Sequence, residues 1–365
     1  MSNPSVGFYS PYFPDQFGGG ERYLLSIAET LSESYRVIML VHPEKLELAK
    51  KNLPIYEKRF GLKLSGISLS PTGLGKVRSP LSSVAQTVKF DMFFAMTDGS
   101  IFPTGCKNSY FIVQLPWTRQ LSLVEKLKLK TWKRILVYSD FVKEILSKSW
   151  ETDKVKVLEP YVDTMEFVPD TKENIILSVG RFFAHSSSNS KRQDVLIEAF
   201  RKFHLQDKTG YTLVLSGSLD PGPETRSYVA ELKAAAQGLP INIQSNLSFS
   251  ELKSLYGRAR FYWHAAGFEV DEKLHPENTE HFGITTLEAM SSGAIPIVVP
   301  KGGQSEILKN DGQHWQTVDE LVAKTMKLAI LPKVKLSELS LEMRESATRY
   351  DKHKFVLQIK KLSAL

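Results

Sequence analysis

The sequence predicts an α/β protein made of two doubly wound parallel sheets. Its 365 residues are more than one hydrophobic core usually holds, so we expect two domains of ordinary size. In both halves of the chain, short apolar segments alternate with segments of helical periodicity, which is typical of parallel sheets covered by helices. The stretch 261–308 shows this alternation most clearly and carries most of the candidate functional residues.

That stretch reads FYWHAA, then an acidic insert, then EHFGITTLEAMSSGAIPIVVPKGGQSEIL. Phe282, Ile284, Leu287 and Met290 recur at helical spacing, and Gly293 stands where a left-handed residue would end the helix. The apolar run that follows predicts a strand buried on both faces of a parallel sheet.

The start of this predicted helix is suited to bind an anion. Gly283 is followed by Ile284, Thr285 and Thr286, so backbone NH groups at the helix start are left without helical partners and point above the sheet. A phosphate is the ligand that such a group of donors favours.

Two glutamates, Glu280 and Glu288, lie around this helix start with seven residues between them. Together with FG, EAM and the later GGxxE, they resemble the retaining glycosyltransferases of family 4, which have the GT-B fold of two Rossmann-like domains facing a cleft. His281 stands where that family usually has glycine, a variant similar to the branch with the eukaryotic lipid-linked oligosaccharide mannosyltransferases.

The resemblance implies roles for these glutamates. Glu288 would accept hydrogen bonds from the two ribose hydroxyls of the donor, and Glu280 would lie nearer the transferred sugar. Without the motif, two glutamates near a helix are usually solvent-facing. His264, at the end of the strand FYWHAA, is either a structural histidine or a donor-binding residue on the same rim as Glu280.

Arg181 and Lys191 are the candidate catalytic cations. The family pattern is a VGR triplet, a variable loop and a lysine before LIEAF, and this chain matches it except that Arg192 replaces the usual glycine. Fixed cations in a water-poor site stabilise the charge that grows on a departing nucleotide diphosphate. The alternatives are a surface ion pair for Arg181 and a solvated helix-leading residue for Lys191.

In the first half, a strand at 6–9 precedes a glycine-rich loop at 10–20 and a helix from Glu21. The motif GGxER resembles the family loop opposite the donor diphosphate, which makes Gly19 and Gly20 cleft residues; a flexible turn is the alternative. Gln114 ends a later strand where many family members carry a histidine, so it would supply a neutral hydrogen bond on the acceptor side.

Asn246 and Leu247 precede a helix for which Ser250 is a reasonable N-cap. The resemblance implies that they border the donor base, and turn and core roles fit equally well. The acidic insert at 267–280 lacks HExxH spacing, and the chain contains no DxD motif, so neither a metal ion nor another cofactor is expected.

The segment VKVLEPYVDTMEFVPD resembles the family's link between domains. It predicts an acceptor-side domain at 1–170 and a donor-binding domain at 171–344. By resemblance, the C-terminal helix, at about 345–365 within a helical pattern that begins near Leu339, packs back on the first domain.

The net charge and composition of the chain limit the classes of partner and the cellular compartment that we expect. A net charge of +7 favours polyanions such as nucleotide-sugar diphosphates, and no nucleic-acid-binding motif accompanies it. One cysteine, no signal-peptide pattern and no long apolar run fit a cytoplasmic protein. The basic run 126–134 is interpreted as a solvated helix face, with peripheral contact at the inner membrane face left open.

The resemblance and these residues together predict a retaining glycosyltransferase. It would move a sugar from a nucleotide-diphosphate donor, with a UDP-sugar such as UDP-glucose slightly favoured, to a hydroxyl of a glycan or lipid-linked acceptor. Three alternatives stay open: a GDP-mannose-dependent mannosyltransferase, a weakly catalytic glycan- or nucleotide-binding subunit, and a hydrolysing epimerase of the same fold.

Overall fold

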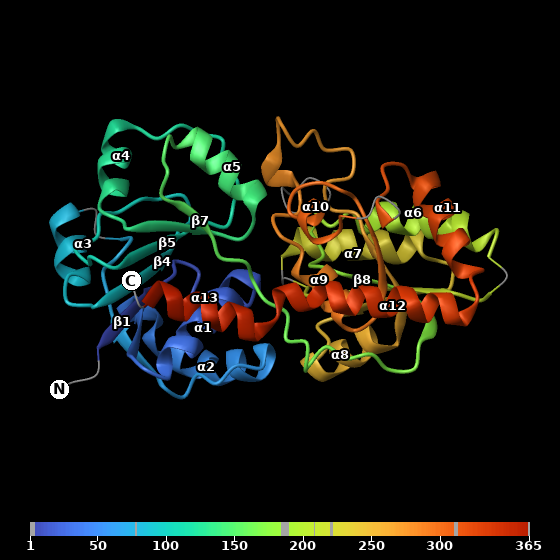
Figure 1. Ribbon diagram of the computed structural model, residues 1–365, viewed down its shortest axis with the longest axis horizontal. Coiled ribbons are helices and arrows are strands. Elements are labelled where there is room, and N and C mark those ends of the chain that lie inside the picture. The colour runs from blue at the N-terminus through green and yellow to red at the C-terminus, as the bar shows by residue number, and fades with distance from the viewer. Residues whose placement is uncertain are drawn as a thin grey trace. The chain divides into compact units, whose positions relative to one another are not determined.

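A computed structural model describes residues 4–76, 79–183, 190–207, 209–219, 222–309 and 313–363. The chain forms two compact units. Unit 1 consists of residues 1–159 together with 353–365, and unit 2 consists of residues 160–352. Figure 1 shows the ribbon of both units, with labels on most helices and on some strands.

Unit 1 is a seven-stranded parallel sheet with helices on its two faces, in the strand order β3-β2-β1-β4-β5-β6-β7. The strand order reverses direction beside β1, as in a doubly wound sheet. Its strands are β1 (Ser5–Tyr9), β2 (Arg36–Val41), β3 (Ile67–Pro71), β4 (Met92–Met96), β5 (Ser109–Ile112), β6 (Arg134–Val137) and β7 (Val155–Val157). Its helices are α1 (Gly19–Ser32), α2 (Leu46–Phe60), α3 (Pro80–Thr87), α4 (Leu123–Lys130), α5 (Asp140–Ser149) and α13 (Lys352–Ser363), with a short 3₁₀ turn at Pro43–Lys45.

Unit 2 repeats the plan with a five-stranded parallel sheet in the order β10-β9-β8-β11-β12. Its strands are β8 (Glu173–Val179), β9 (Thr212–Gly217), β10 (Ile241–Ser245), β11 (Ala259–His264) and β12 (Ile295–Val298). Its helices are α6 (Gln193–His204), α7 (Pro223–Ala235), α8 (Phe249–Arg258), α9 (Ile284–Ser291), α10 (Gln304–Ile307), α11 (Val318–Ala329) and α12 (Lys333–Ala347), with 3₁₀ turns at Pro276–Asn278 and Thr348–Tyr350. The prediction of two doubly wound parallel sheets is confirmed.

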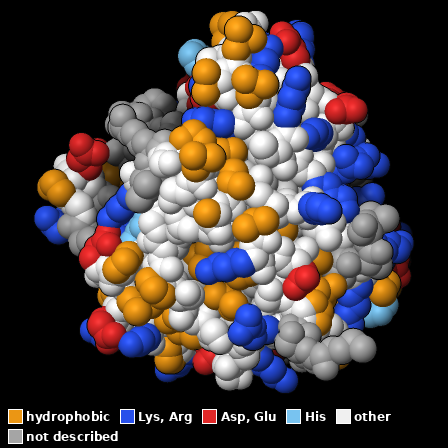
Figure 2. Space-filling view, turned by 90° about the vertical axis from the view of Figure 1, so that its left-hand side faces the viewer, with side chains coloured by type: hydrophobic (Ala, Val, Ile, Leu, Met, Phe, Trp, Pro, Cys, Tyr) orange, Lys and Arg blue, Asp and Glu red, His pale blue; other side chains and the backbone are white. Residues whose placement is uncertain are grey.

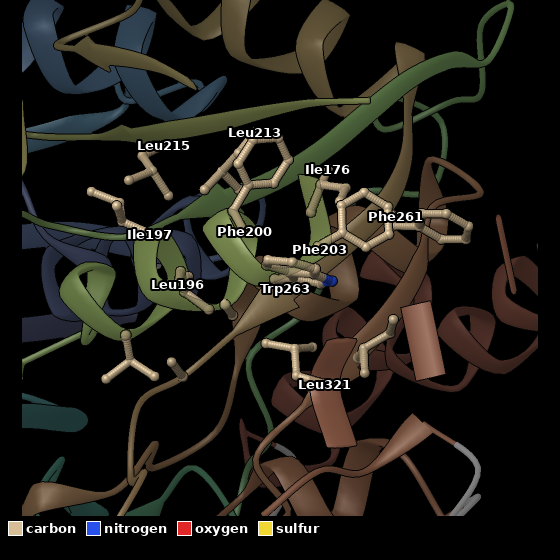
Figure 3. Close-up of a cluster of buried hydrophobic side chains, with 14 of the residues drawn as sticks. Ile176, Leu196, Ile197, Phe200, Phe203, Leu213, Leu215, Phe261, Trp263 and Leu321 are labelled. Carbon is tan, nitrogen blue, oxygen red and sulfur yellow. The ribbon is translucent and has the colours of Figure 1, made fainter. Parts of the chain in front are cut away.

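The core of unit 2 lies between its sheet and the helices α6 and α11 (Figure 3). Phe200 and Phe203 of α6 meet Trp263 of β11, with ring centroids 6.4 and 6.2 Å from the Trp263 ring. All three side chains are fully buried, and Leu321 of α11 packs in the same cluster. This core fixes β11, the strand that ends at His264.

The C-terminal helix packs on unit 1. Phe355 and Ile359 of α13 are buried, and Tyr110 on β5 donates a hydrogen bond of 2.8 Å to the carbonyl of Leu362. The sequence predicts one helix from about residue 339, whereas the structure has two. The 3₁₀ turn Thr348–Tyr350 separates α12, in unit 2, from α13.

The structure divides the chain about ten residues before the predicted link at 170. The residues after Glu159 pack within unit 2: the Phe167 ring makes an edge contact with the Tyr256 ring at 5.6 Å, and the amide of Asp170 donates to the carbonyl of Gly257. Val162 also forms a parallel bridge with Asp351. These partners are far away in sequence, so the local pattern did not reveal them.

Among the residues described, no helix is long and apolar enough to cross a membrane.

Candidate functional site

The start of α9 has the backbone that the sequence predicts. Gly283 is the N-cap residue with φ of +111°, and Gly293 follows the helix with φ of +74°. A Cβ at position 283 would lie only 2.8–3.0 Å from the side-chain amide of Gln304. Glycine is therefore required at this position both by the backbone angle and by the space available.

Side chains under this helix start are held by hydrogen bonds. The amide of Gln304 donates to the hydroxyl of Thr286 at 2.9 Å, and the hydroxyl of Tyr262 donates to that of Thr285 at 2.8 Å. The backbone NH groups of Ile284 and Thr285 donate to no described residue, as expected for the first turn of a helix. They remain available to an anionic ligand.

Three predicted residues meet at one carboxylate oxygen. Oε2 of Glu280 lies 2.6 Å from Nζ of Lys191 and 3.0 Å from Nε2 of His264. The exposed fractions of the side chains are 17% for Glu280, 23% for Lys191 and 2% for His264. We call Lys191, Glu280 and His264 the carboxylate network.

The charge states in this network follow from its contacts. Burial alone would raise the pKa of Glu280, but the Lys191 ammonium and the hydrogen bond from His264 outweigh it and hold that pKa well below its ordinary value. Burial lowers the pKa of His264 despite the neighbouring carboxylate, so its ring is neutral near pH 7. The neutral ring then donates from Nε2 to Glu280.

The backbone at Glu280 is fixed by the GGxxE motif. Gly302 and Gly303 pass so close to residues 280–282 that a Cβ on Gly302 would collide with the Glu280 carbonyl, and one on Gly303 would lie 2.5 Å from Cα of Phe282. The amide of Gly303 donates to the carbonyl of Glu280 at 2.8 Å. The two glycines thus fix the backbone from which the Glu280 side chain of the carboxylate network projects.

Glu288 is buried rather than solvent-facing, with a 4% exposed fraction. The hydroxyl of Tyr256, on α8, donates to Oε2 of Glu288 at 3.0 Å. A buried carboxylate on the helix that begins at the proposed phosphate site can accept further hydrogen bonds from a ligand.

Arg181 lies apart from the carboxylate network. Its side chain is exposed, and its guanidinium lies over the Phe183 ring, 4.5 Å from the centroid. Within the described residues, no hydrogen bond or ion pair joins it to Glu280. Gly180 makes room for Lys191 instead, since a Cβ there would lie 2.6 Å from Cγ of that lysine.

Arg192 lies in a backbone conformation that favours glycine. It caps α6 in a left-handed conformation, with φ of +50°. Its side chain offsets the strain by bonding to Asp194, by donating to the carbonyl of Phe268 at 3.4 Å, and by lying 5.5 Å from the Phe268 ring centroid.

Unit 1 brings Gly20 and Gln114 together. A Cβ on Gly20 would lie 2.5–2.9 Å from the side-chain amide of Gln114, which follows β5. The predicted loop ends earlier than expected, because α1 begins at Gly19; the backbone NH of Gly18 donates to Glu21 at 3.0 Å. Gly19 and Gly20 are therefore the first two helical residues.

The structure gives Asn246 a turn role. Its φ is +56°, its amide donates to the carbonyl of Gly217 at 2.9 Å, and its side-chain oxygen accepts from the amide of Leu219 at 3.0 Å. Leu247 next to it is partly exposed, and base contact by these two residues stays a prediction. The helix after them is capped by Ser248, not Ser250: the Ser248 hydroxyl accepts from the amide of Glu251.

The acidic insert packs beside the site. Glu272 accepts a hydrogen bond of 3.1 Å from the amide of Gly302, and Lys301 donates to the carbonyl of Val270 at 2.5 Å. Across the described part of the chain, no group of three or more His, Cys, Asp or Glu side chains is placed to hold a metal ion.

Sequence reasoning missed three residues that support the site: Tyr256, Tyr262 and Gln304. Two of them carried a signal. Gln304 is an x position of GGxxE, and Tyr262 shares a face of β11 with His264 because side chains alternate along a strand. Tyr256 lies on a different helix from Glu288, and nothing in the sequence links the two.

Residues 164–350 match the family described as glycosyl transferases group 1. The chain belongs to this family. It is 26% identical over 231 residues to the O-antigen chain mannosyltransferase RfbU of Salmonella typhimurium, covering 62% of this chain and 58% of that protein. It is 23% identical over 253 residues to the alpha-1,3/1,6-mannosyltransferase ALG2 of Candida glabrata, covering 59% of this chain and 54% of the relative. The match thus spans little more than half the length of either relative.

Solved structures establish the fold. HepE of Anabaena, solved in complex with UDP, superposes with a TM-score of 0.70 at 16% identity, covering 99% of this chain and 100% of HepE. Sucrose-phosphate synthase of Thermosynechococcus elongatus gives 0.69 at 15% identity, covering 99% and 98%. The group 1 glycosyl transferase described here has the GT-B fold, as predicted.

Proposed function

We propose that this group 1 glycosyl transferase moves a sugar from a nucleotide-diphosphate donor to a hydroxyl acceptor, with retention at the anomeric carbon. The observation that carries the proposal is the carboxylate network of Lys191, Glu280 and His264, whose central residue Glu280 lies four positions before the first residue of α9. A partly buried ion pair that precedes a helix start with unpaired NH groups suits a ligand that carries both a diphosphate and a sugar.

Each group has a role in the proposed reaction. The NH groups of Ile284 and Thr285, with Lys191, bind the diphosphate, and Arg181 adds positive charge after its side chain leaves the Phe183 ring. Glu288 accepts hydrogen bonds from the ribose. Glu280 accepts from a hydroxyl of the transferred sugar. No step uses a metal ion or cofactor.

The bond between the anomeric carbon and the phosphate oxygen breaks, and a bond to the acceptor oxygen forms on the same face of the sugar. The acceptor proton passes to the departing phosphate oxygen, whose new charge Lys191 and the helix start stabilise.

For the donor, we now favour GDP-mannose over a UDP-sugar. The two relatives described above are named mannosyltransferases, and a third, from Xenopus tropicalis, is named a GDP-Man-dependent alpha-1,2-mannosyltransferase and is 26% identical over 179 residues. The UDP complex of HepE supports the fold alone at 16% identity. The acceptor is a hydroxyl of a glycan or lipid-linked sugar.

The test is a transfer assay with purified protein, a panel of glycan acceptors, and either GDP-mannose or UDP-glucose. We expect release of GDP and a mannosylated product. UDP release instead would reassign the donor. Donor binding without turnover would indicate a binding subunit instead of an enzyme. Release of free sugar in the absence of an acceptor would favour a hydrolysing epimerase.

Two variants probe the carboxylate network. Lys191→Met and Glu280→Gln should each lower kcat by about 100-fold or more, since loss of one preorganised charge contact commonly has that effect. Lys202→Met is the matched control, because Lys202 forms an exposed ion pair with Asp319 in the same unit. This variant should keep its activity within about twofold of the unmodified chain. Equal activity of all three variants would refute the proposed roles.

A further inference from the structure

Helix α4 exposes an apolar face to solvent. Leu123, Val124 and Leu127 are 81%, 61% and 63% exposed, although they lie on a helix whose Leu129 is buried in the core of unit 1. Capping by Ser122 and Glu125 fixes this helix, so its exposed leucines do not result from fraying. Such a cluster on one short helix is more than the scattered apolar residues of an ordinary surface.

Helix α3 extends the same surface. Leu81 and Val88 are 81% and 60% exposed. Two consecutive residues hold the ends of both helices: the amide of Thr104 donates to the hydroxyl of Thr131 after α4, and the amide of Gly105 donates to that of Thr87 at the end of α3. The ends of α3 and α4 are thus tied together at one end of unit 1 (Figure 1), and we call the exposed apolar residues of these helices the α3–α4 surface.

Lysines border these apolar residues. Lys128 and Lys130 of α4 form no ion pair with a described residue, and Lys107, next to the connecting residues, is exposed. Two nearby carboxylates are paired with cations: Glu125 with Arg119 at 2.9 Å, and Glu151 with Lys126. Figure 2 shows this side of the molecule, where hydrophobic side chains lie among Lys and Arg side chains.

We propose that the α3–α4 surface binds the surface of a membrane that contains anionic lipids. Leucine and valine on the exposed face of a helix can enter the boundary between headgroups and acyl chains, while the neighbouring lysines attract anionic headgroups. Charge complementarity selects this partner, because Lys128 and Lys130 border the apolar residues, while the neighbouring Glu125 and Glu151 are each paired with a cation. The proposal concerns unit 1 alone and is independent of the donor or the reaction.

The test is flotation of the full chain with vesicles of phosphatidylcholine, with and without phosphatidylglycerol. We expect binding to the anionic vesicles only, weakened by salt. Lys128→Gln with Lys130→Gln should weaken it by about 25-fold, since each cation near the surface contributes about fivefold. Leu123→Ser with Leu127→Ser should weaken it by at least about tenfold.

Matched controls separate this surface from the overall charge and apolarity of the protein. Lys51→Gln with Lys58→Gln changes two exposed lysines on α2, and Leu205→Ser with Ile330→Ser changes two exposed apolar residues of unit 2. Both controls should bind vesicles as the unmodified chain does. No flotation with anionic vesicles at low salt, or equal losses in the α3–α4 variants and the controls, would overturn the proposal, whether or not the chain transfers sugar.

Discussion

At the scale of single residues, the candidate site depends on two carboxylates with different surroundings. Lys191 and His264 both contact the Oε2 atom of Glu280, and they hold the pKa of that carboxyl well below its ordinary value. Glu288 lies deeper and contacts Tyr256. The first carboxylate is neutralised by a cation, and the second can accept hydrogen bonds from a neutral ligand such as a ribose.

The variant Glu288→Gln tests whether the Glu288 carboxylate accepts hydrogen bonds from the ribose of the ligand. The substitution keeps the shape but replaces a charged acceptor with a neutral amide, so nucleoside diphosphate should bind about 10- to 100-fold more weakly. Tyr256→Phe is the matched control, because it removes the internal hydrogen bond to Glu288 and leaves the carboxylate. Isothermal titration calorimetry with GDP and UDP measures both. Unchanged affinity in Glu288→Gln would exclude ribose recognition by this residue.

The low pKa of His281 predicts how the free energy of unfolding depends on pH. Burial, together with Lys191, lowers the pKa of His281 to about 4, although Glu280 and Glu277 act in the opposite direction. Between pH 6.5 and 4 the unfolded chain therefore binds the proton that the folded chain rejects, so stability falls as the pH falls through this range. From pH 7 to 5 the loss is on the order of 2 kcal/mol.

His281→Gln should remove that share of the pH dependence. Thermal unfolding of the variant and the original chain at pH 7 and pH 5 gives the comparison, with the variant gaining relative stability at pH 5. His275→Gln, on the exposed acidic insert, is the control and should follow the original chain. Parallel pH profiles for all three proteins would show that His281 does not titrate as expected.

At the scale of elements, the start of α9 places the strictest demand on the sequence. Gly283→Ala puts a side chain at φ of +111° and against Gln304, so it should destabilise the protein by about 2 kcal/mol or more and weaken donor binding. Gly238→Ala is the control: its φ is +77°, but no atom lies within 4 Å of the added Cβ. Thermal unfolding should show a smaller loss for Gly238→Ala, of about 1 kcal/mol. Equal losses of stability in the two variants would mean that the Gln304 side chain moves away from the added Cβ without an energetic cost.

Much of the fold was predictable because its signals are local. The strands β2 and β8 and the helices α6 and α9 were evident from apolar runs and helical spacing, and Gly293 marked a helix end. The sequence placed His264, at the end of a strand, on the same rim as Glu280 and left a structural role open; the contact between the two side chains agrees with the shared rim.

Other features depend on contacts that no local pattern contains. The contact of Tyr256 with Glu288 joins two helices, and the packing of Phe167 assigns the crossing segment to unit 2. Arg181 was grouped with Lys191 by motif, but its contact with the Phe183 ring arises from the side-chain conformation, which spacing does not determine. Ser248, not Ser250, is the N-cap residue of α8, because Glu251 forms a capping box with Ser248.

At the scale of the whole molecule, each unit has its own buried core, so we expect damage to one core to act mainly within that unit. Phe355 of α13 is the informative residue. The 193 residues of unit 2 separate it in sequence from the rest of unit 1, yet its ring lies 6.0 Å from that of Tyr23 on α1. Phe355→Ala should destabilise unit 1 by about 3–5 kcal/mol through the cavity it leaves. Hydrogen exchange should then show faster exchange in β1, β5 and α1, with β8 and β11 little changed. Phe203→Ala, in the core of unit 2, should give the reverse pattern. If Phe355→Ala instead exposes the strands of both units equally, the two cores unfold as one cooperative body.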